Sequence, residues 1–468
     1  MQHRVVLVQP PVDKRFSSLN MTFKRLAPPL GLSILACETE RRLEKDLNIK
    51  VYCPDSISEE FIHTCTECDI LGISTWFSNY ENGLALARIA KKANPEILVI
   101  FGGTNATNLG KRVLLNRPEV DLVVCGDGED VLWRIIEGQN YSSIPNLWYR
   151  DESNAYNFTK TEHVDINSLG IWDFRHSIEM KLEDYDSQLS NYKFNPELPP
   201  IGLSMTRGCM KATKQCKRCD YCSIPVGNFR GTKQEKVWMQ VQHLYELYGI
   251  ESYFETGDDF THVEYARKLS KIKPSNLPFR LRIYASPWSL IDECVGVLSE
   301  LGVYEVFVGL ETIDKDISYR TGHISTKNNV IDALERLKNA DLSVCLPFLF
   351  GLPGETPSSL WNNVDFANEL VERYSNIRMV LISLAIPLIG SQWFNRLSSN
   401  RTVCETYNKL GGNLETDDVL NYYHLLEFSL KQEGAVSIGK LVEALEAMRK
   451  HLEHRVVVGC FGGIEIME

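Results

Sequence analysis

The chain has 468 residues, of which 44% are hydrophobic and 24% are charged, and its formal net charge is −11. This length allows two or three domains, each with its own core. No stretch approaches about 18 consecutive apolar residues, and the first residues lack the apolar core of a signal peptide, so we expect a cytoplasmic protein without membrane contact. The acidic charge argues against a nucleic acid as the main partner.

Residues 1–150 alternate short apolar runs with helical patterns. We expect strands at 5–8, 49–53, 70–74, 97–101 and 122–125. Five strands joined by helical crossovers predict an open, doubly wound parallel sheet, whose ligands bind at the carboxyl ends of the strands. The residues expected there are small or polar: Ser74, Thr75, Gly102, Gly103, Thr104, Gly126, Gly128 and Glu129. Glycines at these positions let the backbone approach a flat ligand closely, although tight turns alone would also explain them.

The rest of the chain is predicted to contain a second α/β unit. Residues 151–198 are expected to form a connecting segment that packs across both halves. Within residues 199–395 we expect six more strands, at 201–206, 252–256, 280–286, 305–310, 343–350 and 378–386. Such units predict a partial (β/α)6 barrel with its chemistry at the carboxyl ends of the strands. Residues 396–468 are expected to form a small helical domain.

Four of the 13 cysteines lie within residues 209–222, directly after the first expected barrel strand. Clustered thiols in a chain without a secretory signal are metal ligands more often than disulfides. Three thiolates from one loop suit an iron–sulfur cluster, whose iron favours soft sulfur ligands. A structural zinc site is the alternative, but such sites usually pair two separated C-x2-C hooks, which this spacing does not provide.

A cysteine loop after the first strand of a barrel resembles the cluster loop of the radical S-adenosylmethionine (SAM) superfamily. Three further motifs follow later strands in the order of that family: residues 255–259 (ETGDD), 309–312 (GLET) and 351–356 (GLPGET). The resemblance implies a [4Fe-4S] cluster with one iron open for SAM. It also implies SAM contacts at Gly257, Asp258, Glu311 and Gly354.

The spacing of the cysteines departs from the C-x3-C-x2-C pattern that is usual in the family. We assign Cys209, Cys219 and Cys222 as the iron ligands, because Tyr221 then stands at the aromatic position before the last cysteine. The competing set is Cys209, Cys216 and Cys219. Cys216 is also a candidate for a fourth ligand or a proton donor.

The N-terminal half resembles the cobalamin-binding domain that precedes the barrel in one class of radical SAM enzymes. The resemblance lies in residues 27–32 (APPLGL), 72–74 (GIS), 101–107 (FGGTNAT) and 124–129 (VCGDGE). It implies a Rossmann-like cobalamin domain over residues 1–150. The D-x-H-x-x-G motif that supplies a histidine to cobalt in related domains is absent, since Ser56, Ile57 and Ser58 follow Asp55. Cobalamin is therefore expected to bind without a lower histidine ligand.

Together the two resemblances imply an enzyme that methylates an unactivated carbon of a small metabolite or peptide. In such enzymes a 5′-deoxyadenosyl radical removes a hydrogen atom and methylcobalamin delivers the methyl group, with electrons from a flavodoxin- or ferredoxin-like donor. Radical ring formation or rearrangement without methyl transfer is the alternative reaction. A non-catalytic cobalamin-binding protein with a structural metal site is a further alternative, but it would have no use for the SAM motifs. No catalytic side chain is singled out, since His262 and His323 are better interpreted as polar neighbours of the site.

Overall fold

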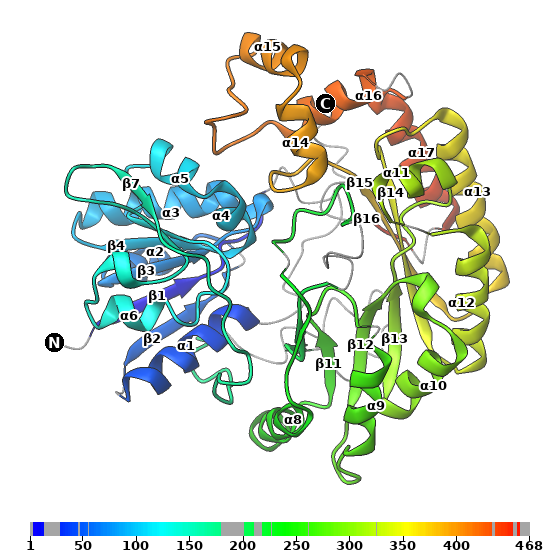
Figure 1. The fold of residues 1–468 in the computed structure, drawn as a ribbon, viewed down its shortest axis with the longest axis horizontal. Coiled ribbons are helices and arrows are strands. Elements are labelled where there is room, and N and C mark those ends of the chain that lie inside the picture. Colours follow the sequence, from blue (N-terminus) through cyan, green and yellow to red (C-terminus); the bar gives the residue numbers. More distant parts are fainter. Residues whose placement is uncertain are drawn as a thin grey trace.

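The structure, a computed structural model, consists of two α/β lobes with further helices on top (Figure 1). It describes residues 3–13, 29–44, 47–54, 56–178, 201–209, 218–225, 227–260, 262–323, 325–432, 436–452 and 456–458. Residues 27, 28, 55 and 216, to which the sequence analysis refers, lie outside these ranges. No helix within them is both long and apolar enough to cross a bilayer.

The first lobe contains a seven-stranded sheet in the order β2-β1-β3-β4-β5-β6-β7. Its parallel strands are β1 (Arg4–Val8), β2 (Asn48–Tyr52), β3 (Ile70–Ser74), β4 (Leu98–Gly102) and β5 (Leu122–Val124). All five were predicted. The order 2-1-3-4-5 reverses direction between β1 and β3, which is where ligands bind in doubly wound sheets.

Helices cover both faces of this sheet because successive side chains of a strand point to opposite sides. Val5 and Leu7 belong to one core cluster with residues of α1 and α6, whereas Val6 and Val8 belong to another with residues of α2 to α5. The helices are α1 (Leu30–Leu43), α2 (Glu59–Thr66), α3 (Tyr80–Ala93), α4 (Gly103–Leu109), α5 (Lys111–Asn116) and α6 (Leu132–Ile136), with short 3-10 turns η2 (Phe77–Asn79) and η3 (Tyr141–Ser143).

The first sheet continues beyond residue 150, where the sequence suggested a boundary. The antiparallel strands β6 (Leu147–Arg150) and β7 (Tyr156–Phe158) extend it at one edge. At the other edge Ser177 forms a parallel bridge with Val51. The connecting segment thus belongs partly to the first sheet. It also packs against the second lobe, because the backbone N–H of Trp172 donates to Gln240 at 3.0 Å.

The second lobe contains a curved sheet in the order β16-β15-β14-β13-β12-β11-β8, all parallel. The strands are β8 (Ile201–Leu203), β11 (Ser252–Glu255), β12 (Arg280–Ala285), β13 (Val303–Val308), β14 (Ser343–Phe350), β15 (Ile377–Leu384) and β16 (Val456–Val458). Six were predicted, and the partial barrel is confirmed. The seventh, β16, comes from the C-terminal region that was expected to be helical, and it pairs with β15.

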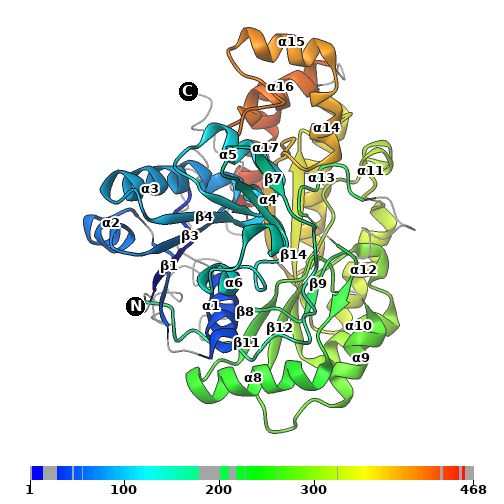
Figure 2. The ribbon, with the colours of Figure 1, turned by 60° about the vertical axis from the view of Figure 1, so that its left-hand side comes forward.

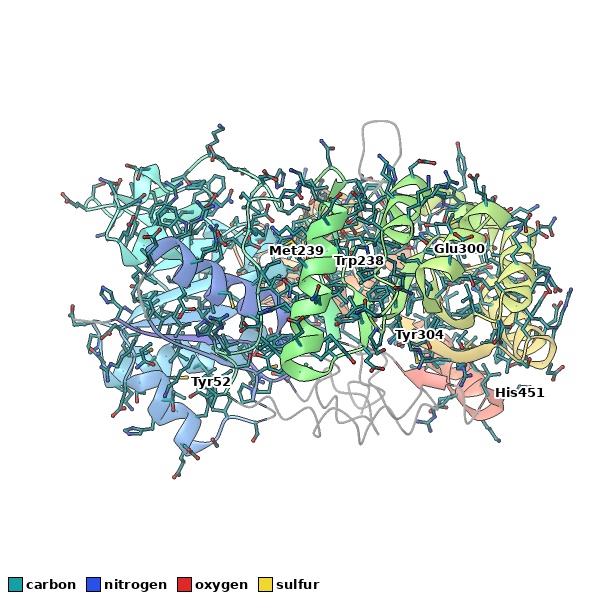
Figure 3. All side chains as sticks on the ribbon, turned by 90° about the horizontal axis from the view of Figure 1, so that it is seen from below. Tyr52, Trp238, Met239, Glu300, Tyr304 and His451 are labelled. Carbon is teal, nitrogen blue, oxygen red and sulfur yellow. The ribbon has the colours of Figure 1, made fainter. Side chains whose placement is uncertain are left out.

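Helices cover the outside of this sheet. They are α8 (Gln234–Tyr248), α9 (Val263–Lys271), α10 (Asp292–Leu301), α11 (Lys315–Thr321), α12 (Lys327–Asn339) and α13 (Pro357–Arg373), with the turn η7 (Pro287–Ser289). Each buries one face. On α8, for example, Trp238 is 4% exposed while its neighbour Met239 is 60% exposed (Figure 3).

The C-terminal region adds α14 (Gln392–Ser398), α15 (Arg401–Lys409), α16 (Tyr422–Gln432) and α17 (Ile438–Leu452). Helix α17 packs against α13 and leads into β16, so it completes the barrel layer. Its predicted apolar stripe, which includes Leu441, Leu445 and Met448, is buried. Helices α14, α15 and α16 lie at one end of the molecule (Figure 2).

Candidate functional site

The cluster loop, which carries Cys209, Cys219 and Cys222, begins next to a buried carboxylate that holds the preceding backbone in place. Glu255, at the end of β11, is fully buried and accepts hydrogen bonds from the backbone N–H groups of Met205 (3.0 Å), Thr206 (2.9 Å) and Gly257 (3.1 Å). It also accepts from the Thr206 hydroxyl at 2.7 Å. Burial raises the pKa of Glu255 to about 7 against the effect of these four hydrogen bonds. The carboxylate thus joins the ends of two barrel strands directly before the first cysteine.

A sharp turn precedes Cys209. Thr206–Arg207 forms strand β9, which pairs antiparallel with β10 (Arg230–Gly231). Gly208 follows with φ +85°, and a Cβ there would lie 2.5 Å from the carbonyl oxygen of Asn228. Only glycine fits, because both the positive φ and the close carbonyl exclude a side chain. This turn sets the direction in which Cys209 leaves the sheet.

Cys219 and Cys222 lie on a short turn, in which the N–H of Cys222 donates to the carbonyl of Cys219 at 3.2 Å. His323, two residues after α11, is buried and donates from Nε2 to the carbonyl of Gly309 at 2.7 Å. Its Nδ1 lies 3.5 Å from the Cys219 sulfur. Burial and the nearby charge of Glu311 raise the pKa of Tyr221 well above its ordinary value. The cysteine turn therefore lies beside the end of β13 and beside the segment that follows α11.

The three cysteines assigned as iron ligands have the donor chemistry that an iron–sulfur cluster needs. Cys209, Cys219 and Cys222 are half-buried thiols, and soft sulfur donors are those that such a cluster requires. In the described parts of the chain, no three His, Cys, Asp or Glu side chains are already close enough to hold a metal ion. The donor set fits the cluster, and binding would draw the three sulfurs together.

The residues expected to contact SAM lie after the carboxyl ends of β11, β13 and β14. Gly257 is packed so tightly that a Cβ would lie 2.1 Å from the Thr206 hydroxyl. Burial, and then the charge of Asp259, raise the pKa of Asp258 to about 6. Glu311 has φ +61° and forms an isolated bridge to Phe348 on β14. Gly354, with φ +91°, lies against the Arg320 guanidinium.

The residues expected to contact cobalamin gather at the ends of β3, β4 and β5. Thr75 is fully buried, and its backbone N–H donates to the carbonyl of Gly102 at 2.8 Å, so it joins β3 to β4. Gly103 has φ +86°, and a Cβ would lie 2.7 Å from the Thr75 carbonyl. Ser74, Gly102 and Thr104 are half-buried at the same edge.

The loop after β5 shows two different environments. Gly126 has φ +99° and no atom within 4 Å of where a Cβ would stand, so its outer side is open to a flat ligand. Gly128 is also uncrowded, with its nearest neighbour, Val124, at 3.8 Å. Glu129, in contrast, is buried and forms an ion pair with Arg207 at 2.5 Å. The open glycines fit a corrin ring, whereas Glu129 links the two lobes.

A surface cavity of about 380 Å³ lies between residues 313–315, which directly follow the motif after β13, and helices α12 and α13. Asp314, Lys327, Asp365 and Glu369 line it between α12 and α13. Lys327 is already paired with Glu369 at 2.8 Å. Because no described residue of the cluster loop lines this cavity, we assign it no role in the reaction.

Two family models match the chain in separate regions. The radical SAM superfamily model matches residues 203–367, and the B12 binding domain model matches residues 18–136. The fold and the strand-end sites thus define a cobalamin-binding domain joined to a radical SAM domain. The chain thus carries both domains that together characterise the cobalamin-dependent radical SAM enzymes. Its cofactors are a [4Fe-4S] cluster, SAM and cobalamin, as predicted.

Two curated proteins are similar to this chain in sequence. An uncharacterized methyltransferase from Pyrococcus horikoshii is 25% identical to this chain, and the alignment covers 87% of this chain and 86% of the relative. An anaerobic magnesium-protoporphyrin IX monomethyl ester cyclase from Cereibacter sphaeroides is 20% identical over 58% of this chain and 45% of its own.

Among solved structures, the radical SAM methyltransferase TsrM from Kitasatospora setae, with cobalamin and a [4Fe-4S] cluster bound, has a TM-score of 0.66. It is 16% identical and covers 86% of this chain and 76% of its own. The cobalamin-dependent SAM radical enzyme OxsB has a TM-score of 0.61 and is 14% identical. The match covers 93% of this chain and 62% of OxsB. Both support the same two-domain fold.

Several residues of the site carried no signal in the sequence. Asp220 is buried between the two cysteines of the turn, and Arg396 on α14 donates to its carboxylate. Asn108 donates to the carbonyl of Ser223 at 2.8 Å. His323 was interpreted only as a polar neighbour, but it contacts Cys219. Their partners are far away along the chain, so no local pattern marks them.

Proposed function

We propose that this enzyme transfers a methyl group from SAM, through cobalamin, to a carbon atom of a small metabolite or peptide. The observation that carries the proposal is the contact between the cysteine loop of the barrel and the loop after β5 of the cobalamin domain, where Arg207 meets Asp127 and Glu129. A corrin and a cluster held in these two places would share one reaction space. A relative that covers most of both chains is named a methyltransferase, which supports the proposal.

The residues of the chain would bind, orient and shield the reactants. Cys209, Cys219 and Cys222 would hold the cluster, and the strand ends at Gly257, Asp258, Glu311 and Gly354 would hold SAM. When bound, the cluster and SAM supply a 5′-deoxyadenosyl radical, and methylcobalamin supplies the methyl group. Glu255 and Gly208 would fix the start of the cluster loop, because a radical reaction depends on close placement of the reacting atoms.

A test that needs no substrate follows from the first half of this reaction. The anaerobically reconstituted protein, with cob(I)alamin and SAM labelled in its methyl group, is expected to form labelled methylcobalamin and S-adenosylhomocysteine in equal amounts. If neither compound forms while SAM and cobalamin are both bound, the proposal is wrong.

The ligand set has its own test. Iron content after reconstitution should fall strongly in Cys209→Ala, Cys219→Ala and Cys222→Ala and stay near the wild-type value in Cys216→Ala. Loss of iron in Cys216→Ala with retention in Cys222→Ala would favour the other ligand set. Zinc without iron in every variant would contradict a cluster.

Radical ring formation without methyl transfer is the second candidate, because one relative is named a cyclase. This reaction would yield 5′-deoxyadenosine without transfer of the SAM methyl group to cobalamin. We expect the electrons in either case to come from a flavodoxin- or ferredoxin-like protein.

A further inference from the structure

The cobalamin domain binds the cluster loop of the barrel at both of its ends. Arg207 lies two residues before Cys209, and Ser223 directly follows Cys222. Arg207 forms ion pairs with Asp127 and Glu129, and the carbonyl of Ser223 accepts from Asn108. The three partners belong to the first lobe, more than 70 residues earlier in the chain.

At the start of the loop, Asp127 is shared between two arginines. Its carboxylate lies 3.1 Å from Arg207 and 2.8 Å from Arg230, the paired residues of β9 and β10. It also accepts from the backbone N–H of Val164 at 3.0 Å. Burial would raise the pKa of Asp127, but the hydrogen bond from Arg230 and the two guanidinium charges keep it below its ordinary value. The group is therefore charged at neutral pH and holds both strands of the ribbon.

At the end of the loop, Asn108 lies at a junction of three segments. Its amide donates to the carbonyl of Ser223 at 2.8 Å. The same amide packs against Gly390, which follows β15 with φ +91°, and a Cβ there would lie 2.5 Å from it. Any side chain at residue 390 would push Asn108 away from Ser223. Helix α4, the end of the cluster loop and the segment after β15 thus meet at Asn108.

The two contacts lie on the segments expected to bind cobalamin. Asn108 is on α4, which begins at Gly103, and Asp127 stands between Gly126 and Gly128. In addition, the hydroxyl of Thr107, beside Asn108, accepts from the N–H of Gly126 at 3.0 Å. A ligand that orders these two segments would therefore order the groups that hold the cluster loop.

We propose that Asp127 and Asn108 are positioning residues through which the cobalamin domain holds the two ends of the cluster loop, residues 204–209 and 218–225, so that cobalamin binding and the stability of these two ends are coupled. Such coupling is reciprocal, because each event must favour the other by the same factor. The inference depends on the two cofactor domains and not on methyl transfer, so it can fail or hold independently of that reaction.

The test measures hydrogen–deuterium exchange in the cluster-free protein with and without hydroxocobalamin. In the wild type, cobalamin should slow exchange in peptides that cover residues 204–209 and 218–225. In Asp127→Asn and Asn108→Ala, measured at hydroxocobalamin concentrations that saturate each variant, the cobalamin-dependent protection of these peptides should fall about tenfold, since each variant removes a charge-assisted or buried hydrogen bond. Because the coupling is reciprocal, the cobalamin Kd should rise by no more than the same factor.

A matched control is Asp418→Asn, which removes another contact between the first lobe and the C-terminal region. Asp418 accepts from the Tyr80 hydroxyl at 2.7 Å and pairs with Arg117 at 2.6 Å. This variant should retain the cobalamin-dependent protection of the cluster loop. If it loses the protection to the same extent as Asp127→Asn, general docking of the lobes explains the effect and the proposal is wrong.

Two further outcomes are informative. Unchanged exchange in both Asp127→Asn and Asn108→Ala would overturn the proposal, as would loss of cobalamin binding without any change in the loop. If Asp127→Asn does not fold, Arg230→Gln provides the same test, because it removes the 2.8 Å pair from the other side.

Discussion

Arg396 on α14 donates to both carboxylate oxygens of Asp220, although the two residues lie 176 positions apart in the chain. Asp220 stands between Cys219 and Cys222 and is 1% exposed. Its backbone N–H donates to Thr321 at 2.7 Å, and its carbonyl accepts from Trp393 at 3.0 Å. The cysteine turn is therefore held by a helix that follows the barrel, which gives this part of the C-terminal region a role at the site.

We expect Arg396→Gln to lower the iron content of the reconstituted protein. The variant would leave the buried carboxylate of Asp220 with fewer hydrogen-bond donors. The loss of stability should lie toward the lower end of about 1–3 kcal/mol, because the Arg396 side chain is half-exposed and solvent screens its charge. Iron assay and urea unfolding measure the two effects. Arg401→Gln, which breaks the exposed pair with Glu405, is the control and should change neither.

Replacing Gly208 with alanine should disrupt the start of the cluster loop. The positive φ and the carbonyl oxygen of Asn228 at 2.5 Å leave no room for a methyl group, so we expect a loss of roughly 1–3 kcal/mol and of most bound iron. Gly296→Ala is the matched control, because this glycine lies within α10 with nothing within 4 Å. The control should raise stability by about 0.5–1 kcal/mol. Similar behaviour of the two variants would contradict the assigned role of Gly208.

His323→Ala should separate the cysteine turn from β13. The change leaves the carbonyl of Gly309 without its 2.7 Å donor, and a lost buried hydrogen bond costs about 1–3 kcal/mol. Cys219 would lose a neighbour at 3.5 Å at the same time. Thermal unfolding of the metal-free protein and the iron content after reconstitution would report the two losses. His262→Ala, at an exposed helix start, should leave the iron content unchanged.

The metal-free protein is expected to lose stability as the pH rises from about 4.5 to about 7. Burial raises the pKa of Glu355 from 4.5 to about 7 against the hydrogen bonds from Ser359 and Gly351. Because the folded protein binds this proton more tightly than the unfolded chain, its contribution is complete below pH 4.5 and is lost as the pH passes 7, by at most roughly 3 kcal/mol. Glu255, whose pKa burial also raises to about 7, acts in the same range and with the same sign. Glu355→Gln should therefore make the decline shallower without abolishing it, as measured by denaturant titrations at several pH values. An equally steep decline in the variant would show that Glu355 does not contribute.

Local sequence patterns were enough to predict most of the strands and the order of the motifs. Residues 5–8 and 70–73 are short apolar runs followed by the polar residues Gln9 and Ser74, and such runs form buried parallel strands. The cysteine spacing and the glycine motifs are also local, because adjacent residues of one loop carry them. The parallel sheets, the partial barrel and the identity of the cofactors could therefore be inferred before the structure.

The seventh barrel strand was not predicted. Val456–Val458 is a β-branched run before Gly459, which favours a strand, but it is only three residues long and follows a long helical pattern. It becomes a strand because α17 packs on α13 and brings it beside β15, whose backbone groups it pairs with. Strands β6 and β7 likewise depend on the exposed edge that β5 offers.

The sequence by itself determined which residues are suited to bind iron, SAM and cobalamin, because the chemistry of thiols, carboxylates and glycines belongs to the residues. Tertiary structure alone decided how these residues are held: Asp220 by Arg396, Ser223 by Asn108, and Arg207 by Asp127. Each pair joins segments that the fold brings together over 80 to 176 positions of the chain. Hydrogen bonds and ion pairs act over a few ångströms in space, and the spacing of residues along a chain does not reveal which distant groups will come that close.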